Sequence, residues 1–280
     1  MIIAITGGKG GTGKSTVATA LAMMLAKNNK VLLVDADVDC PNDHIILSIN
    51  SKKIKNVKTM IPKFDKNKCI KCGTCSRVCR ENAIVFIKGK TPFLIPDQCI
   101  GCKACKIACP VNAISEKEQI IGEILSGKKG NITLITGVMK PRIEESSLIV
   151  NAVKKYVKPK EKNYDYIVID TAAGTHCPVI AALLDVDLGI AVTEPTPLGN
   201  HDLKLILDLM KKLKIKSKIF LNRSNIASKK ETQKISKKFK TEIIAEIPYS
   251  KKIQEAYSKG IPIKHKSIEK LAKEIENMNI

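Results

Sequence analysis

Short apolar runs alternate with amphipathic stretches along most of the chain. The first run, Met1–Thr6, is followed by a glycine-rich turn, a helical pattern over Ser15–Lys27 and a second apolar run at Val31–Val34. Strand, helix and strand in this order form one βαβ unit. After residue 130 the alternation resumes, and there we expect strands at Ile132–Ile135, Tyr166–Ile169, Leu188–Val192, Lys218–Asn222 and Glu242–Ile247. Uninterrupted apolar strands between helices predict a doubly wound, mostly parallel α/β sheet covered on both faces.

The alternation stops between about Pro62 and Lys117, where regularly spaced cysteines replace the apolar runs. Residues 68–84 are paralleled by residues 98–114, and both halves end in Asn-Ala-Ile, so this stretch contains an internal repeat. We therefore predict two units. Residues 1–61 and 118–280 form a discontinuous α/β domain, and residues 62–117 form a small inserted domain.

Composition narrows the setting in which the protein works. No apolar run approaches the roughly 20 residues of a membrane-spanning helix, and the N-terminus enters a strand directly instead of a signal peptide. We therefore expect a cytoplasmic protein. Because the cytosol keeps thiols reduced, ten clustered cysteines favour metal binding over disulfides.

The formal net charge of +21 comes almost entirely from lysine. Clustered lysines attract nucleic acid, but here the lysines are spread over every segment and stacking aromatics are scarce. We interpret them as solvated helix faces and do not expect a nucleic-acid partner.

A membrane partner is not expected either. The C-terminal segment has an apolar stripe at helical spacing, which we interpret as core packing and not as a membrane anchor; it consists of Ile268, Leu271, Ala272, Ile275 and Met278.

A glycine-rich sequence between the first strand and the first helix has the context of a phosphate-binding loop. Its backbone N–H groups and the helix N-terminus favour phosphate oxygens, Lys14 offers a charge to the outer phosphates, and a Ser15 or Thr16 hydroxyl suits Mg²⁺. We therefore expect ATP and Mg²⁺ to bind here. The loop consists of Gly8, Lys9, Gly10, Gly11, Thr12, Gly13, Lys14 and Ser15.

The extra lysine early in this loop, Lys9, makes the chain resemble the MinD/ParA group of P-loop ATPases. The resemblance implies an ATP-sandwich homodimer, in which Lys9 reaches the nucleotide of the second subunit, and ATP hydrolysis that is slow without a partner. It also implies adenine contacts from Asn222 and Pro248, within segments that match the family; an asparagine after a strand could equally be a turn residue.

Two aspartates match the switch regions of that family. Asp37 follows the strand that ends near Asp35 and lies where the family positions the attacking water. Asp170 ends an apolar strand and begins a second switch. Carboxylates at strand ends lie beside bound phosphates and can hold Mg²⁺ through water. Asp35 and Asp39 are close in sequence, so which carboxylate has which role stays open, as does a simple turn-capping role.

The cysteines follow the spacing of the bacterial ferredoxin run twice. In ferredoxins with two clusters, the fourth cysteine of each run binds the other cluster. We therefore predict two [4Fe-4S] clusters in an α+β, ferredoxin-like insertion, with zinc as the alternative metal. One cluster would take Cys69, Cys72, Cys75 and Cys109, and the other Cys99, Cys102, Cys105 and Cys79. Arg80 replaces the proline that usually follows the fourth cysteine, which changes the local charge but not the ligands.

Two cysteines lie outside these runs. Cys177 follows Asp170 at a spacing that resembles the bridging cysteine of the nitrogenase iron protein, which implies a possible extra thiol ligand. No cysteine lies between Cys109 and Cys177 to supply the second ligand that such a bridge needs. A buried structural thiol is the alternative for Cys177, and the favoured interpretation for Cys40.

As a whole, the chain resembles MinD-superfamily ATPases with an inserted ferredoxin domain. The resemblance leaves three hypotheses for its role. The first is ATP-gated electron transfer to an unknown redox partner. The second is assembly or delivery of metalloclusters to a partner protein. The third is positioning on a membrane or DNA, for which redox clusters have no evident use.

Overall fold

The computed structural model describes residues 1–278 and places the predicted strands in one sheet. Seven of its strands are parallel, in the order β11-β10-β9-β1-β8-β2-β7, which confirms a mostly parallel α/β sheet. They are β1 (Ile2–Thr6), β2 (Val31–Ala36), β7 (Ile132–Met139), β8 (Tyr166–Thr171), β9 (Leu188–Thr193), β10 (Lys216–Leu221) and β11 (Glu242–Glu246).

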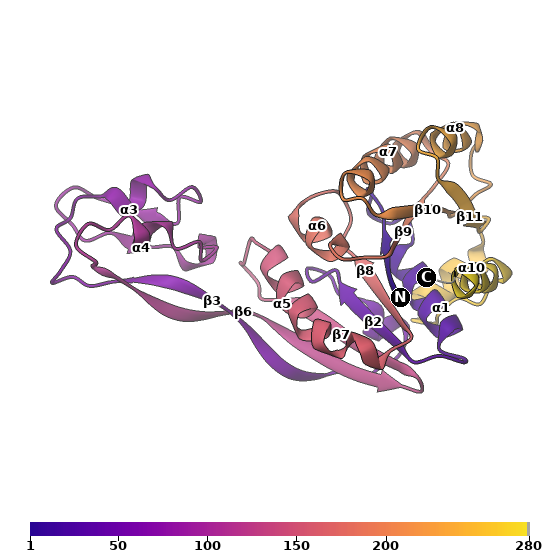
Figure 1. Ribbon diagram of the computed structural model, residues 1–280, viewed down its shortest axis with the longest axis horizontal. Helices are drawn as coiled ribbons and strands as arrows, with labels where there is room; N and C mark the ends of the chain where they lie inside the picture. The colour runs from indigo at the N-terminus through magenta and orange to yellow at the C-terminus, as the bar shows by residue number, and fades with distance from the viewer. Residues whose placement is uncertain (279–280) are drawn as a thin grey trace.

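Helices cover both faces of this sheet (Figure 1). Alternate residues of each strand point to opposite faces, so Ile3 and Ile5 pack with one group of helices and Ala4 with the other. The first face carries α1 (Lys14–Leu25), α2 (Asp43–Ile46), α9 (Lys251–Ser258) and α10 (Lys266–Asn277). The second face carries α5 (Ser147–Val157), α6 (Cys177–Leu183), α7 (Pro197–Lys212) and α8 (Lys230–Lys238), with the 3-10 helix η2 (Lys158–Asn163) following α5.

The C-terminal apolar stripe belongs to the core. Ile268, Leu271, Ala272 and Ile275 are at most 3 % exposed, and α10 packs against α1. The interpretation as packing is therefore confirmed. In residues 1–278, none of the helices has the length and apolar character needed to cross a membrane.

Two long antiparallel strands that the sequence analysis did not predict extend the sheet at one edge. β6 (Ile114–Lys129) pairs with β7, and β3 (Lys52–Phe64) pairs with β6. The last residue of β7, Met139, pairs with Gly122, so residues 114–121 of β6 continue with β3 beyond the sheet as a two-stranded ribbon. At about 3.3 Å per residue the ribbon projects roughly 25 Å. It projects from the carboxyl edge of the parallel strands.

The ribbon carries residues 65–113 at its tip, which we call the cysteine lobe (Figure 1). The lobe has its own small core, formed by Cys75, Ile84, Cys105 and Ile114. Its elements are short: α3 (Thr74–Arg77), β4 (Ile84–Val85), β5 (Phe93–Leu94), the 3-10 helix η1 (Pro96–Gln98) and α4 (Ala104–Ile107). The predicted domain boundaries, at 62 and 118, fall inside β3 and β6.

Candidate functional site

The glycine-rich loop joins β1 to α1 at the carboxyl edge of the sheet. Gly11 and Gly13 have φ of 76° and 96°, a left-handed backbone that other residues adopt only with strain. Gly8 lies so close to the Asp202 carbonyl that a Cβ would collide with it. The sequence therefore needs these glycines to bring backbone N–H groups to one side of the loop.

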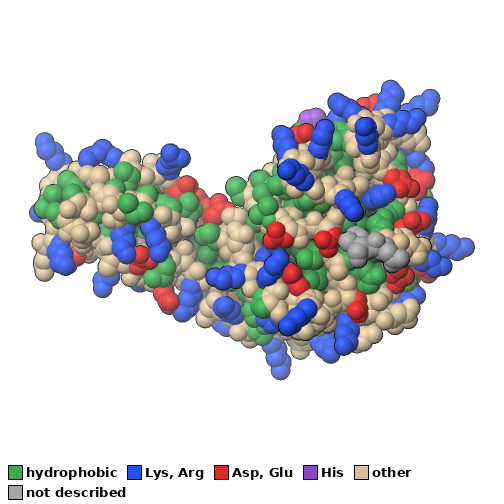
Figure 2. Space-filling view, viewed as in Figure 1, with side chains coloured by type: hydrophobic (Ala, Val, Ile, Leu, Met, Phe, Trp, Pro, Cys, Tyr) green, Lys and Arg blue, Asp and Glu red, His purple; other side chains and the backbone are tan. Residues whose placement is uncertain are grey.

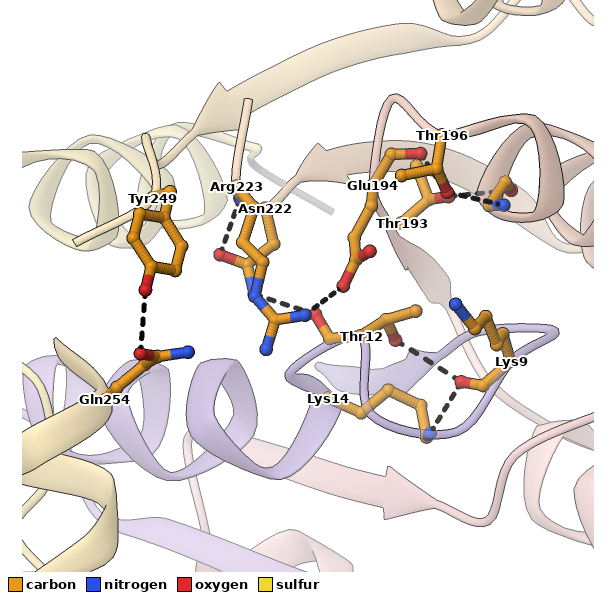
Figure 3. Close-up of polar contacts among 11 residues, drawn as sticks. Lys9, Thr12, Lys14, Thr193, Glu194, Thr196, Asn222, Arg223, Tyr249 and Gln254 are labelled. Atoms are coloured by element: carbon orange, nitrogen blue, oxygen red, sulfur yellow. Dashed lines mark hydrogen bonds and ion pairs between the residues drawn. The ribbon is translucent and has the colours of Figure 1, made fainter. Parts of the chain in front are cut away.

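The two lysines of the loop are placed differently (Figure 3). Lys14 is only 7 % exposed, and its Nζ donates a hydrogen bond to the Lys9 carbonyl at 3.3 Å. Burial lowers the pKa of Lys14, although the carboxylates of Asp170 and Asp37 oppose that shift. The side chain of Lys9 is half-buried and points away from Lys14. Lys14 thus sits inside the subunit's own loop, whereas the Lys9 side chain takes no part in that contact.

A hollow of about 320 Å³ opens beside the loop. It brings together the predicted phosphate residues Lys14, Ser15 and Thr16 with the predicted base-site residues Asn222 and Pro248. Its volume falls in the range of small-molecule sites. The hollow can therefore seat a nucleotide with its phosphates on the loop.

Asn222 has a different immediate role from the one expected. Its Nδ2 donates to the Thr12 carbonyl at 2.7 Å, and its Oδ1 accepts from the Arg223 N–H at 2.9 Å. Both ends of the amide are thus engaged within the chain, and Asn222 braces the phosphate loop from β10.

The same hollow contains residues that the sequence analysis did not single out as ligands. Tyr249 and Tyr257 line it, and the Tyr249 hydroxyl donates to Gln254 Oε1 at 3.0 Å. Both tyrosines are 46 % exposed, so their rings are accessible to a flat ligand. Arg223 forms an ion pair with Glu194, which is 5 % exposed.

The candidate switch aspartates separate clearly in the structure. Asp35 is fully buried at the end of β2 and accepts hydrogen bonds from the N–H groups of Asp37 and Asp43. Asp37 is half-buried and close enough to Lys14 that each affects the other's pKa. Asp39 is exposed. Of the three, Asp37 has the position suited to a group that faces a bound phosphate.

Asp35, Asp43 and Asp170 form a buried carboxylate cluster, with oxygens within 4.8 Å of one another. Sequence analysis missed Asp43, because its burial depends on the packing of α2 and is not visible in local pattern. Burial raises the pKa of Asp170 to about 7, while a hydrogen bond from Ser15 and the charge of Lys14 hold it down. Burial also raises the pKa values of Asp35 and Asp43, as does repulsion between the carboxylates.

The donor set beside the loop suits Mg²⁺. Asp170 Oδ1 is buried without a hydrogen-bond partner among the described residues, and its carboxylate adjoins the Ser15 hydroxyl. Hydroxyl and carboxylate oxygens are the ligands that Mg²⁺ takes together with phosphates. A cation here would satisfy the orphaned oxygen and offset the repulsion between the carboxylates.

The eight clustered cysteines line two separate cavities in the cysteine lobe. Each cavity contains three cysteines of one run and the fourth cysteine of the other. One is lined by Cys69, Cys72, Cys75 and Cys109, which we call set 1. The other is lined by Cys79, Cys99, Cys102 and Cys105, which we call set 2.

The two halves of the lobe repeat their backbone conformation. Left-handed residues recur at equivalent positions whatever the side chain: Lys71 with Gly101, Gly73 with Lys103, and Asn82 with Asn112. Alternating left-handed residues curl the loop around its cavity and turn successive N–H groups inward. The internal repeat seen in the sequence is therefore also a repeat of loop geometry.

The thiols of these sets fit a metal cluster chemically. Burial raises the pKa of Cys105 to about 11 and also raises the pKa values of Cys75 and Cys99. Four converging thiolates in a partly buried cavity need a cation to offset their charge, and iron in a cluster supplies it. At Cys72, which is exposed, hydrogen bonds from Thr74 lower the pKa.

The two remaining cysteines are both exposed. Cys177 is the first residue of α6, just after the second switch, and Cys40 lies in the turn after Asp37. The interpretation of either as a buried structural thiol is therefore wrong. Their surroundings leave both thiols accessible to solvent and to a partner.

Comparison with known proteins places the fold and its nucleotide site. The chain is 38 % identical over 279 residues to an uncharacterized protein of Methanocaldococcus jannaschii, covering 99 % of this chain and 97 % of that one. It is 23 % identical over 277 residues to an iron-sulfur cluster carrier protein of Pyrococcus horikoshii, covering 93 % and 78 %. The septum site-determining protein MinD of Pyrococcus horikoshii, solved with Mg-ADP, has the same fold, with a TM-score of 0.63, 22 % identity and coverage of 99 % and 96 %.

A family match covers the part of the chain that contains the loop, the hollow and the candidate switch aspartates. Residues 3–263 match the CobQ/CobB/MinD/ParA nucleotide-binding domain. The match spans the cysteine lobe as well as the sheet. The chain therefore belongs to the MinD/ParA superfamily of P-loop ATPases.

Proposed function

We propose that the protein is an ATP-hydrolysing iron-sulfur protein, in which nucleotide-dependent changes of a homodimer are coupled to electron transfer through two [4Fe-4S] clusters. One observation carries the proposal. Two cavities, each lined by four cysteines, lie at the end of a ribbon that starts at the nucleotide edge of the sheet. The inserted domain would have the ferredoxin-like ligand arrangement.

The nucleotide site would work through residues already in position. Lys14 and the loop N–H groups would bind the phosphates, and Ser15, Thr16 and Asp170 would hold Mg²⁺ directly or through water. Asp37 would orient the attacking water. Lys9, whose side chain points away from Lys14, would reach the nucleotide of a second subunit.

The cluster site would depend on the two crossed cysteine sets. Clusters of this kind supply low-potential one-electron chemistry when bound. The chain's own contribution is to hold the ligands in curled loops and to keep Cys75 and Cys105, both 7 % exposed, away from water. Each set contains cysteines from both halves of the lobe. Because each cysteine lines only one cavity, loss of one cysteine removes a ligand from that cavity alone.

Metal analysis of anaerobically purified protein tests the proposal. We expect about eight irons per chain and the electron paramagnetic resonance signals of two reduced clusters. Cys69→Ser should remove about half the iron, and Cys109→Ser should remove the same cluster as Cys69→Ser. Zinc without iron, in cells supplied with both metals, would overturn the assignment.

Delivery of clusters to another protein is the second candidate. The accessible thiols of Cys40 and Cys177, together with the similarity to a cluster carrier protein, favour it over positioning on membrane or DNA. If delivery is the role, labile iron bound at Cys177 should move to an apoprotein acceptor. Cys177→Ser should stop this transfer and leave the eight irons of the lobe in place.

A further inference from the structure

The two halves of the cysteine lobe are equivalent in backbone but not in surroundings. Set 2 lies against the ribbon, where Met60, Ile61 and Glu116 line its cavity. Set 1 lies farther out, where only the last ribbon residues, Phe64 and Ile114, reach its cavity. Phe64 is four positions beyond Met60 on β3, a rise of about 13 Å along the strand, so set 1 is the set farther from the sheet.

Hydrophobic exposure follows the same asymmetry. Ile70 and Ile100 occupy equivalent positions after the first cysteine of each half. Ile100 lies beside Met60 in the set 2 cavity and is partly covered, whereas Ile70 is 60 % exposed at the set 1 cavity. Ile107, which is 83 % exposed, lies midway between Cys105 of set 2 and Cys109 of set 1 and lines neither cavity. The lobe thus leaves the apolar side chain of Ile70 uncovered beside set 1.

The positions of the lysines also differ between the two halves of the repeat. Around set 1 the first half carries Lys66, Lys68 and Lys71, all exposed. The equivalent positions in the second half are Pro96, Gln98 and Gly101. The second half instead carries Lys103 and Lys106, where the first half has Gly73 and Ser76, so the two halves place their lysines at different positions. The three lysines of the first half therefore lie on the side of the exposed set 1 cavity.

Two lysines beside the set 2 cavity share one carboxylate of the ribbon. Lys103 and Lys106 both form ion pairs with Glu116, at 2.8 and 2.7 Å. Within residues 1–278, none of Lys66, Lys68 and Lys71 has an ion-pair partner. Figure 2 shows Lys and Arg side chains alongside hydrophobic ones on the surface of the lobe. Positive charge without an ion-pair partner among the described residues therefore flanks Ile70 at the set 1 end.

We propose that this end of the lobe is the docking face for an acidic electron-carrier protein, and that electrons enter at set 1, which is reoxidised when it passes them to set 2. The inference rests on the proposed cluster content. An apolar centre with a charged rim is the usual anatomy of a transient protein interface, and the rim sets the rate of encounter. Each transfer oxidises the carrier by one electron and reduces the receiving cluster by one, with no bond made or broken.

A carrier protein fits this face better than nucleic acid does. Both are anionic, but residues 65–113 contain no Tyr or Trp, and the exposed Phe93 does not line the set 1 cavity, so the face lacks the aromatics that stack on bases. The exposed Cys72 also places a set 1 ligand directly at the face, held by a loop whose Cys72 carbonyl accepts a hydrogen bond from Arg77 at 3.0 Å. Close approach to a redox centre matters to a carrier and not to a polynucleotide.

Binding of an acidic two-cluster ferredoxin, used as the probe, tests the face. We expect Lys68→Glu with Lys71→Glu to weaken its binding at least tenfold at low salt and to flatten the salt dependence. Ile70→Ser should weaken binding about fivefold at every salt concentration. Lys211→Glu with Lys214→Glu, which makes the same charge change on the sheet body, is the matched control and should leave binding unchanged.

Iron content and reduction by dithionite, measured on each variant, separate the two levels of the proposal. Wild-type protein without iron would defeat the proposed function itself. Full iron and normal dithionite reduction, with carrier binding equal in wild type and in both double variants, would overturn the docking face alone. Loss of RNA binding or of self-association in the Lys68/Lys71 variant, with carrier binding intact, would also overturn it by naming another occupant.

Discussion

Three carboxylates at the edge of the sheet that carries the nucleotide site are buried without a counter-charge in residues 1–278 that satisfies them. Asp170 has a buried oxygen with no partner among the described residues, and Asp35 and Asp43 lie beside it. Isolated carboxylates are expensive to bury, so in the absence of a cation the cluster retains protons. Binding of a metal ion by these carboxylates would therefore release the protons that they hold.

We predict that the affinity for Mg-ATP falls as pH falls below about 7, because Asp170, whose pKa is raised to about 7, must lose its proton to serve the cation. Titration by calorimetry should show roughly tenfold weaker binding per pH unit for each proton displaced. Asp39→Asn, a change at an exposed carboxylate, should keep this dependence, and Asp43→Asn should reduce it.

The stability of the nucleotide-free protein should change in the opposite sense. The folded state holds protons that the unfolded state, with carboxyl pKa near 3.9, has released between about pH 4 and 7. The free energy of unfolding should therefore decrease as pH rises through this range. Urea unfolding at several pH values checks the sign, and Asp43→Asn should flatten the curve.

Substitution of the two lysines of the phosphate loop should have different effects on ATP binding and hydrolysis. Lys14→Ala should abolish useful ATP binding, since Lys14 lies within the loop of its own subunit. Lys9→Ala should spare much of the affinity but impair hydrolysis and nucleotide-dependent dimerisation. Equal losses of ATP affinity in the two variants, measured by calorimetry, would contradict action across a dimer.

At the scale of elements, the sequence pattern predicted the strands that are buried on both faces and missed the strands that are exposed. Val31–Val34 and Leu188–Val192 are continuous apolar runs, and both are strands. β3 instead contains Lys52, Lys53, Lys55, Lys58 and Lys63, and most of it is exposed on both sides, so it has no apolar periodicity. It is a strand because β6 pairs with it along its length, with ion pairs such as Lys58–Glu118 at 2.7 Å.

The same limit applies to the site. Motifs that act through a local loop, such as the glycines around Lys14 and the two cysteine runs, could be read directly from the sequence. Asp43, Glu194 and Tyr257 join the nucleotide site only because separate elements pack together. Nothing in their sequence neighbourhood distinguishes them from other polar or aromatic residues.

Gly101 offers a test of how the cysteine loops depend on the ribbon. It has φ of 73°, and a Cβ there would collide with Thr59 Oγ1. We predict that Gly101→Ala loses about four of the eight irons, those of set 2, and keeps its ATP affinity. Gly89→Ala is the matched control: its φ of 82° gives it comparable strain, but it has open space around it. Equal iron content in the two variants would contradict the prediction.

For the whole molecule, a short chain of backbone contacts joins the first switch to the ribbon. The carbonyl of Val38, next to Asp37, accepts a hydrogen bond from Met139 N–H at 3.0 Å. The following residue, Lys140, donates to the Ile121 carbonyl of β6 at 2.9 Å. Movement of the switch toward a γ-phosphate would therefore pull on the base of the ribbon.

We predict that ATP shifts the reduction potential of at least one cluster. Because coupling is reciprocal, oxidised and reduced protein should bind ATP analogues with different affinities, by roughly 5- to 150-fold for a typical coupling. Anaerobic titration of both redox states, with potentials measured with and without nucleotide, checks this. Identical affinities with unchanged potentials would mean that the two parts of the chain work independently.

The register of the ribbon also bears on how such a protein arises. Phe64 and Ile114 are paired residues, so the chain enters and leaves the lobe at points only about 5 Å apart. A tight turn could join them without shifting any strand of the sheet. Gain or loss of the entire lobe thus requires one insertion or deletion in a gene, at a single hairpin. An ATPase that carries the cysteine lobe and one that lacks it stand a single recombination event apart.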